Sequence, residues 1–427
     1  MAIWQESFEH AQLSDVGMRR RNNQDSLGMV LAADENIWHA RGHVLMVADG
    51  MGAHAAGELA SKIAVDTVPH LYLKLRDLPP GEALERAIIE ANSEVHRRGQ
   101  ANPEFHNMGT TSSVLAILPD AAWIAHIGDS RVYRLRGDCL EQLTFDHSLV
   151  WEARRDNNWP AGIDPTHALP RNVITRSLGP NAQIVVDVEG PFPVEPGDTF
   201  LLCSDGLTGA LTDEELAPIL AHLPAEEAAA VLVDLANLRG GPDNITVLVG
   251  RVLPAWRQKA GATPEAARRV TPPRADVHPA VWVGAGVCFL AAVGLLIARQ
   301  PWLAGIGAVL GTLVAGLGWA FRGGGARTND KAGASNRTSK APYTRTSCSN
   351  ATQFLQKLST LTAELRSAAV EASLDVGALD QACRQAAEAG RTGQTAQALR
   401  LYARSISSVM NDFRRRKHEA NDSVVDL

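Results

Sequence analysis

Four aspartates stand at the ends of apolar segments, where the chain turns. Asp49 ends LMVAD and precedes Gly50, Asp129 ends WIAHIGD, Asp205 ends FLLCSD, and Asp243 directly precedes ITVLVG. Any one of them is most simply a turn cap. Carboxylate oxygens are also the natural ligands of Mg²⁺ and Mn²⁺, and a glycine lets an ion approach the backbone carbonyl. The recurrence therefore predicts a site for hard divalent cations that includes the Gly50 carbonyl.

A fifth carboxylate, Asp25, follows several arginines in the segment MRRRNNQDS. Guanidinium groups match the geometry of phosphate oxygens. Two metal ions about 3.5–4 Å apart can share a water and lower its pKa, so that the resulting hydroxide attacks phosphorus in line. Carboxylates and arginines together predict metal-assisted hydrolysis of a phosphate ester.

The elements that must position these residues lie within residues 1–253. Short runs rich in Val, Ile and Leu recur there between Gly, Asp and Pro, which is typical of strands. Residues 57–73 and 81–99 instead have apolar positions at helical spacing. Short turns join neighbouring strands, as in AAWIAHIGDSRVYRLRGDCLEQL, which favours antiparallel sheets with helices packed outside over a βαβ repeat.

Eight motifs occur in order along this region. They are GMRRRNNQDS, VADGMGAHAAGELAS, MGTTSSVL, HIGDSRVYRLR, LTFDHSLV, RNVITRSLG, LLCSDGLTGALTDEEL and GGPDNITVLV. Together they resemble the bacterial metal-dependent Ser/Thr protein phosphatases of the type 2C (PPM) family, over roughly residues 7–253. The resemblance implies an α+β fold, a four-layer α/β/β/α sandwich of two antiparallel sheets. It also implies hydrolysis of phosphoserine and phosphothreonine without a covalent phosphoenzyme, with two Mn²⁺ or Mg²⁺ ions and a third in bacterial relatives.

The resemblance assigns metal-binding roles position by position. Asp49 would bridge two ions, and the Gly50 carbonyl would bind one of them. Asp205 and Asp243 would complete the shell of the other. Asp25 would hold a metal-bound water or lie just outside the shell.

Further roles follow from the same resemblance. Asp129 in GDSR matches a ligand of the third ion, shared with Asp205. Arg20 matches the arginine that binds the substrate phosphate, and Asn244 would fix the orientation around Asp243.

The chain departs from the family pattern near the predicted general acid. Ala53 stands where bacterial relatives usually have glycine, and Met51 occupies the slot of the general-acid histidine of eukaryotic relatives. His54 is the remaining candidate to protonate the leaving alkoxide, with metal-bound water as the alternative. His147 is expected to make a structural hydrogen bond rather than to act in catalysis.

Residues 149–171 occupy the place of the mobile flap beside the active site in the family. They are polar and contain Gly and Pro, as an adaptable substrate-facing loop would be. Trp151 and Trp159 in this segment are expected either to contact a phosphopeptide or to pack onto the domain.

Charge and cysteine content argue against a nucleic-acid-binding protein and against a fold held by disulfides or zinc. Residues 1–253 carry 19 Lys and Arg against 35 Asp and Glu, a net charge of −16, which suits divalent cations better than nucleic acid. The five cysteines are far apart and form no CxxC, so a disulfide framework or a zinc site is not expected. The first residues, MAIWQESFEH, show no signal peptide.

Two uncharged segments, residues 280–298 and 302–321, follow a Pro-, Ala- and Arg-rich linker at 254–279. A bilayer needs about 20 apolar residues per helix, so the pair predicts a transmembrane hairpin. Arg and Lys flank it on both sides, and only Arg299 lies in the turn, which places both flanks in the cytoplasm. An inner-membrane protein with a cytoplasmic catalytic domain is therefore expected; the alternative is a hairpin buried in a soluble core.

The rest of the chain is predicted to be a flexible linker, 322–349, and a helical region, 350–427. We expect phosphorylated proteins as substrates, a Ser/Thr kinase as the opposing enzyme, and the membrane as a partner. Two other interpretations compete: a scaffold that has lost turnover, and a membrane sensor that acts through the C-terminal helices.

Overall fold

Two antiparallel sheets carry the described part of the chain. The computed structural model describes residues 3–53, 55–156, 159, 163–170, 172–259, 340–348 and 351–425. The first sheet has the order β1 (Phe8–Asp15), β11 (Ile245–Val252), β10 (Thr199–Cys203), β7 (Arg131–Arg136), β8 (Cys139–Gln142) and β12 (Thr344–Ser347). The second has the order β2 (Asp25–Val30), β3 (His43–Met51), β5 (Ser112–Ile117), β6 (Ala121–Ile127) and β9 (Asp187–Pro193), with β4 (Gly109–Thr110) paired to β3.

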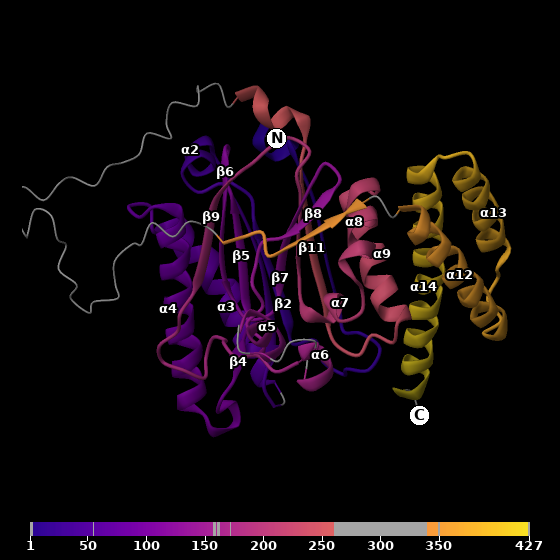
Figure 1. The fold of residues 1–427 in the computed structure, drawn as a ribbon. Coiled ribbons are helices and arrows are strands. Elements are labelled where there is room, and N and C mark those ends of the chain that lie inside the picture. Colours follow the sequence, from indigo (N-terminus) through magenta and orange to yellow (C-terminus); the bar gives the residue numbers. More distant parts are fainter. Residues whose placement is uncertain are drawn as a thin grey trace, which may run out of the picture. The chain divides into compact units, whose positions relative to one another are not determined.

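Helices cover the outer face of each sheet (Figure 1). On the second sheet these are α3 (Ala56–Lys74) and α4 (Pro80–Ala101); on the first they are α8 (Asp213–His222) and α9 (Ala225–Leu238). The short elements are α1 (Ile3–Glu6), α2 (Glu35–Ala40), η1 (Pro103–Phe105), α5 (Leu149–Arg155), α6 (Pro165–Ala168), α7 (Asp205–Thr208) and η2 (Pro254–Lys259). The predicted α+β fold of two antiparallel sheets with helices outside is confirmed, and the two predicted helices are α3 and α4.

Alternate residues of β3 face different layers. Val44 and Met46 pack in the cluster beneath α3 and α4, whereas Leu45 and Val47 pack between the two sheets. This follows from the period of two along a strand. Asp49 has the same parity as Leu45 and Val47, so the strand directs its carboxylate into the inter-sheet layer.

The C-terminal region forms three helices, α12 (Ala351–Glu371), α13 (Gly377–Arg391) and α14 (Thr395–Val425). Residues 338–427 belong to the same compact unit as residues 1–261, and the apolar faces of α12 and α14 share one core cluster with α8 and α9. Two ion pairs join α14 to α9, Arg404 with Glu227 and Arg414 with the buried Asp234. The helical region therefore packs on the outer face of the first sheet's helices.

The structure corrects both predicted linkers at their ends. The linker predicted over 254–279 begins too early, because Pro254–Lys259 form η2 and Trp256 is buried against Phe8 and Trp38. The linker predicted over 322–349 extends too far, because Thr344–Ser347 form β12. Local composition hid both ends, since Trp256 and Thr344–Ser347 are held by partners distant in sequence.

The predicted transmembrane hairpin at 280–321 lies outside the described residues. Among the helices that the structure describes, none is long and apolar enough to cross a membrane.

Candidate active site

Asp25 and Asp49 form a cross-strand pair at one end of the inter-sheet layer. They are opposite each other in the register of β2 and β3. Ser204, at the end of β10 in the other sheet, donates a hydrogen bond of 2.7 Å from Oγ to Asp25 Oδ2. The polar end of the layer is thus built from both sheets.

The other three predicted ligands reach the same place from loops. Asp129 follows β6, Asp205 begins α7 directly after β10, and Asp243 precedes β11. Burial raises the pKa of Asp49 well above its ordinary value, and the charges of the other four aspartates raise it further. The structure therefore brings all five predicted carboxylates into one electrostatic cluster.

Burial and like charge make this cluster a poor place for free carboxylates. Burial raises the pKa of Asp25 to about 6, although hydrogen bonds from Ser204 and Thr246 act in the opposite direction. Burial also raises the pKa of Asp129 and of Asp205. Like charges disfavour ionisation, and a cation would favour it.

One observation shows that the residues present fit a divalent cation. Asp129 Oδ1 and Asp205 Oδ1 are buried and have no hydrogen-bond partner. At Gly50, a Cβ would lie 2.1 Å from the Gly57 carbonyl oxygen, so only glycine fits beside Asp49. Within the described residues, no three acidic, histidine or cysteine side chains are arranged so that they could hold a metal ion as they stand. The site supplies oxygen donors of the type that Mg²⁺ and Mn²⁺ prefer, but no preformed cage.

Arg20 lies at the edge of this cluster. Its Nη2 donates to Asp243 Oδ2 at 2.8 Å, and half of its side chain is exposed. The loop that carries it is held by Asn244, whose Nδ2 donates to the carbonyls of Val16 and Asn22. The role expected of Asn244 was orientation around Asp243; the structure adds that it holds the Arg20 loop.

The left-handed turn at Gly17 also shapes this loop. Gly17 has a φ of +80°, and a Cβ there would lie 2.2 Å from the Asp243 carbonyl oxygen. A glycine is required because the loop backbone runs directly against the start of β11.

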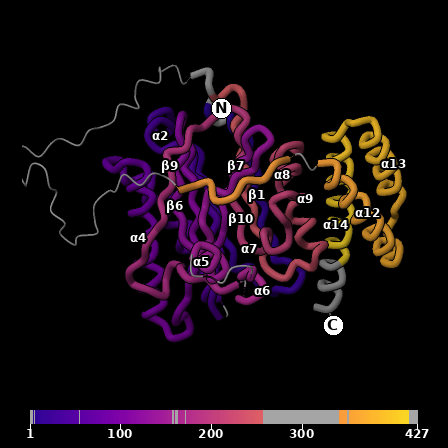
Figure 2. The backbone as a smooth tube through the Cα atoms, in the orientation of Figure 1, coloured from indigo at the N-terminus to yellow at the C-terminus, as the bar shows by residue number. Residues whose placement is uncertain are grey.

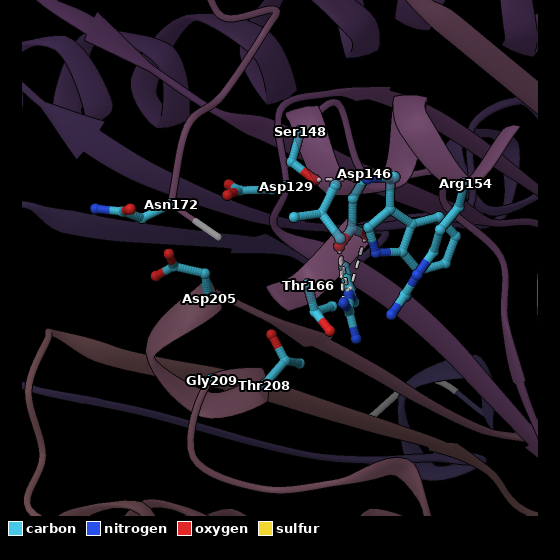
Figure 3. A pocket seen from close by; sticks show the side chains of 12 residues that line it. Asp129, Asp146, Ser148, Arg154, Thr166, Asn172, Asp205, Thr208 and Gly209 are labelled. Carbon is cyan, nitrogen blue, oxygen red and sulfur yellow. Dashed lines mark hydrogen bonds and ion pairs between the residues drawn. The ribbon is translucent and has the colours of Figure 1, made fainter. Parts of the chain in front are cut away.

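A pocket of about 360 Å³ opens beside Asp129 and Asp205 (Figure 3). Its other walls include Trp151 and Arg154 of α5 and Thr166 of α6, all within the predicted flap segment. Trp151 also contacts Phe145 edge to face and lies under the Arg131 guanidinium. Of the two tryptophans expected either to contact a phosphopeptide or to pack onto the domain, Trp151 lines the pocket, whereas Trp159 donates to the Ile163 carbonyl within its own loop.

His54 and His147 are the two histidines considered for a role in catalysis. His147 is buried; its Nδ1 accepts from the Gly128 amide, and its Nε2 lies 3.0 Å from Asp187 Oδ2. These contacts are the structural hydrogen bonds that the sequence predicted for His147. His54, the candidate general acid, lies outside the described residues.

Two supporting residues were not predicted. Ser204 holds Asp25, and the Thr111 hydroxyl accepts from the Asp49 amide at 2.8 Å. Ser204 has the parity of Phe200 and Leu202, which pack between the sheets, so alternation would have found it. Thr111 interrupts strand pairing, and nothing in its local sequence marks it.

Fold and site define a two-sheet sandwich with a cluster of five aspartates at one end of the inter-sheet layer and Arg20 beside it. The family model of protein phosphatase 2C matches residues 19–235. The chain is 37% identical to protein phosphatase PhpP of Streptococcus pneumoniae over 244 residues, which cover 56% of this chain and 96% of that protein. It is 36% identical to the serine/threonine phosphatase stp of Listeria innocua over 247 residues, 56% of this chain and 94% of that protein.

Solved structures of bacterial phosphatases agree with this family match. The serine/threonine phosphatase PstP/Ppp of Mycobacterium tuberculosis aligns with a TM-score of 0.50 and 33% identity, over 58% of this chain and 99% of that one. The phosphatase Stp1 of Staphylococcus aureus aligns with a TM-score of 0.51 and 28% identity, over 57% and 95%. The chain belongs to the protein phosphatase 2C family. The predicted protein-serine/threonine phosphatase activity and its Mn²⁺ or Mg²⁺ cofactors are thereby confirmed.

Proposed function

We propose that this phosphatase is anchored in the inner membrane and binds the phosphate group of a phosphorylated protein at Arg20. The observation that supports the site is the pair of buried, unpartnered oxygens on Asp129 and Asp205, beside the Arg20–Asp243 pair. Asp25, Asp49, Asp205, Asp243 and the Gly50 carbonyl would hold two ions, and Asp129 with Asp205 a third. When bound, such ions supply an activated water and positive charge at the phosphoryl oxygens.

The chain's own residues position the substrate. Arg20 would exchange Asp243 for the phosphate oxygens, since its side chain is half exposed and its loop is held from behind by Asn244. The pocket lined by Trp151 and Arg154 would take the polypeptide next to the phosphorylated residue, because it begins at Asp129 and Asp205. We propose His54 as the proton donor to the leaving alkoxide.

The full-length chain provides the test. With Mn²⁺ it should release phosphate from a phosphothreonine peptide, and a chelator should abolish that release. Calorimetry should show Mn²⁺ binding that weakens in Asp49→Asn, and this readout does not depend on turnover. Mn²⁺ binding without any hydrolysis would favour the competing interpretation, a scaffold that has lost turnover.

The membrane proposal rests on sequence. Residues 280–298 and 302–321 carry no charge, and Arg and Lys flank the pair, so both ends of the chain should be cytoplasmic. Reporter fusions at positions 260 and 330 should both report cytoplasm. A periplasmic signal from position 330 would mean a single span and would favour a sensor role for the C-terminal helices.

A Ser/Thr protein kinase in the same cell is the proposed opponent. A phosphatase of this specificity needs an enzyme that makes phosphoserine and phosphothreonine. Phosphoproteomics of a strain that lacks the protein should show phosphosites that rise in its absence and fall again when the kinase is also removed.

A further inference from the structure

Residues 340–348 lie along the β8 edge of the first sheet. Thr344–Ser347 pair antiparallel with Cys139–Gln142 of β8, and the amides of Tyr343 and Cys348 extend the pairing at either end. The segment runs from β9 across the sheet edge toward α12, in orange in Figures 1 and 2. A distant part of the chain thus covers an edge that would otherwise be open.

Tyr343 connects this segment to the flap through one aromatic residue. Its ring contacts Phe145 with centroids 5.5 Å apart, and Phe145 contacts Trp151 with centroids 5.4 Å apart. The Tyr343 hydroxyl donates to Glu189 Oε1 at 2.5 Å, which fixes the ring. Trp151 lines the pocket, so Tyr343 backs the pocket wall from behind.

Thr344 is linked to the same pocket by a chain of hydrogen bonds. Its hydroxyl donates to Asp213 Oδ2 at 3.2 Å, and Asp213 Oδ1 accepts from the Tyr133 hydroxyl at 2.9 Å. Arg131 in turn donates to the Tyr133 hydroxyl at 2.8 Å, lines the pocket, and has its guanidinium over the Trp151 ring. Two neighbouring residues therefore support two walls of one pocket by independent contacts.

We infer that residues 340–348 are a positioning element for substrate and that Tyr343 is its principal positioning residue. This inference rests on the proposed function, in which the pocket takes the polypeptide beside the phosphorylated residue. Tyr343 touches no reacting group; it acts by holding Phe145 and so Trp151. The segment follows residues 280–321 in sequence, so the chain that leaves the proposed membrane hairpin would directly set the affinity for substrate.

The experiment compares a phosphothreonine peptide, whose polypeptide would lie in the pocket against Trp151, with p-nitrophenyl phosphate, which has no polypeptide to place there. In the full-length chain with Mn²⁺, Tyr343→Ala should raise KM for the peptide about 3- to 10-fold, the size expected for a lost aromatic pair. Its kcat, and both constants for p-nitrophenyl phosphate, should stay at wild-type values. Tyr343→Phe keeps the ring against Phe145 and should restore the wild-type KM.

Arg345→Ala is the matched control. Arg345 is in the same strand, is exposed, and pairs with Glu141 rather than with a pocket residue, so its KM should not change. If Tyr343→Ala does not fold, Tyr343→Leu carries the same expectation.

The outcomes separate the two proposals. A wild-type chain that hydrolyses neither substrate would overturn the proposed function. If the wild-type chain is active on both substrates, a Tyr343→Ala or Tyr343→Leu variant that leaves peptide KM unchanged, or that lowers activity on both substrates equally, would overturn the positioning role.

Discussion

The buried polar side chains at the two ends of the inter-sheet layer differ in whether they have hydrogen-bond partners. At one end, β3 begins with His43, which is enclosed by Phe8, Trp38 and Trp256. His43 Nδ1 accepts from the Ala32 amide at 3.0 Å, and Nε2 lies 3.2 Å from the Trp4 carbonyl, so both ring nitrogens have partners. The buried histidine at this aromatic end is therefore paired.

Asp49 lies near the other end of the same strand, where like charges gather and two nearby carboxylate oxygens have no partner. His43 and Asp49 thus lie toward opposite ends of one strand, yet one end is arranged for stability and the other for binding. Buried, unpaired polar groups cost free energy, so the acidic end lowers stability until a cation is bound. Four predictions test this contrast.

The largest effect is expected for Asp205→Asn. Turnover should fall by about three orders of magnitude, because a metal site supplies several kcal/mol of charge stabilisation in the transition state. Removing one of the mutually repelling charges should leave the melting temperature of the metal-free protein unchanged or higher. Kinetics with Mn²⁺ and thermal melts without it provide the measurements.

Asp198→Asn is the control for this prediction. Asp198 is buried as well, more completely than Asp205, but it accepts hydrogen bonds from the Arg136 guanidinium. Its replacement should lower the melting temperature and spare kcat. Equal stability losses in the two variants would contradict the contrast between paired and unpaired carboxylates.

Trp256→Ala should lower the free energy of unfolding by about 3–4 kcal/mol, the usual cost of removing a buried large aromatic side chain. Trp256 is buried against Trp38, and its indole donates to the Pro119 carbonyl. Urea denaturation gives the value, and kcat with p-nitrophenyl phosphate should remain normal at a temperature where the variant is folded. Loss of less than 1 kcal/mol would mean that η2 is not part of the core.

Arg20→Ala should chiefly raise KM for phosphopeptide, by roughly 10- to 150-fold. A charge-assisted hydrogen bond is worth about 1.5–3 kcal/mol, and binding of phosphate by guanidinium already acts in the ground state. Steady-state kinetics of Arg20→Ala and Arg20→Lys separate the effect of the positive charge, which lysine keeps, from that of the two parallel hydrogen bonds that only a guanidinium makes. A fall in kcat at constant KM would show that Arg20 acts only in the transition state.

The smallest effect concerns pH at the aromatic end. Burial lowers the pKa of His43 from 6.5 to about 4, so the unfolded chain binds a proton that the folded chain does not between these values. The stability contribution of neutral His43 is therefore complete above pH 6.5 and is lost as pH falls toward 4, by roughly 2 kcal/mol at pH 5. Urea melts at pH 7.5 and pH 5 should show a smaller loss in His43→Gln than in wild type. An equal loss in both would assign the dependence to other groups.

Strand alternation and short motifs were sufficient to predict that the five aspartates lie together at one end of the inter-sheet layer. The parity of Leu45, Val47 and Asp49 is a local property, and so are the glycine turn at Gly50 and the arginines before Asp25. Such features can be predicted from sequence because side-chain direction in a strand follows position alone. The family resemblance then supplied roles that parity cannot assign.

Tertiary structure alone decided what supports that centre from a distance. Ser204 reaches Asp25 from the other sheet, and Trp256 closes the aromatic end although its sequence context is that of a linker. Tyr343 stands about two hundred residues from Phe145, and no local pattern links β12 to β8. Pairing between distant segments depends on complementary edges and surfaces that exist only once both are folded, and local sequence does not encode which edge will be free.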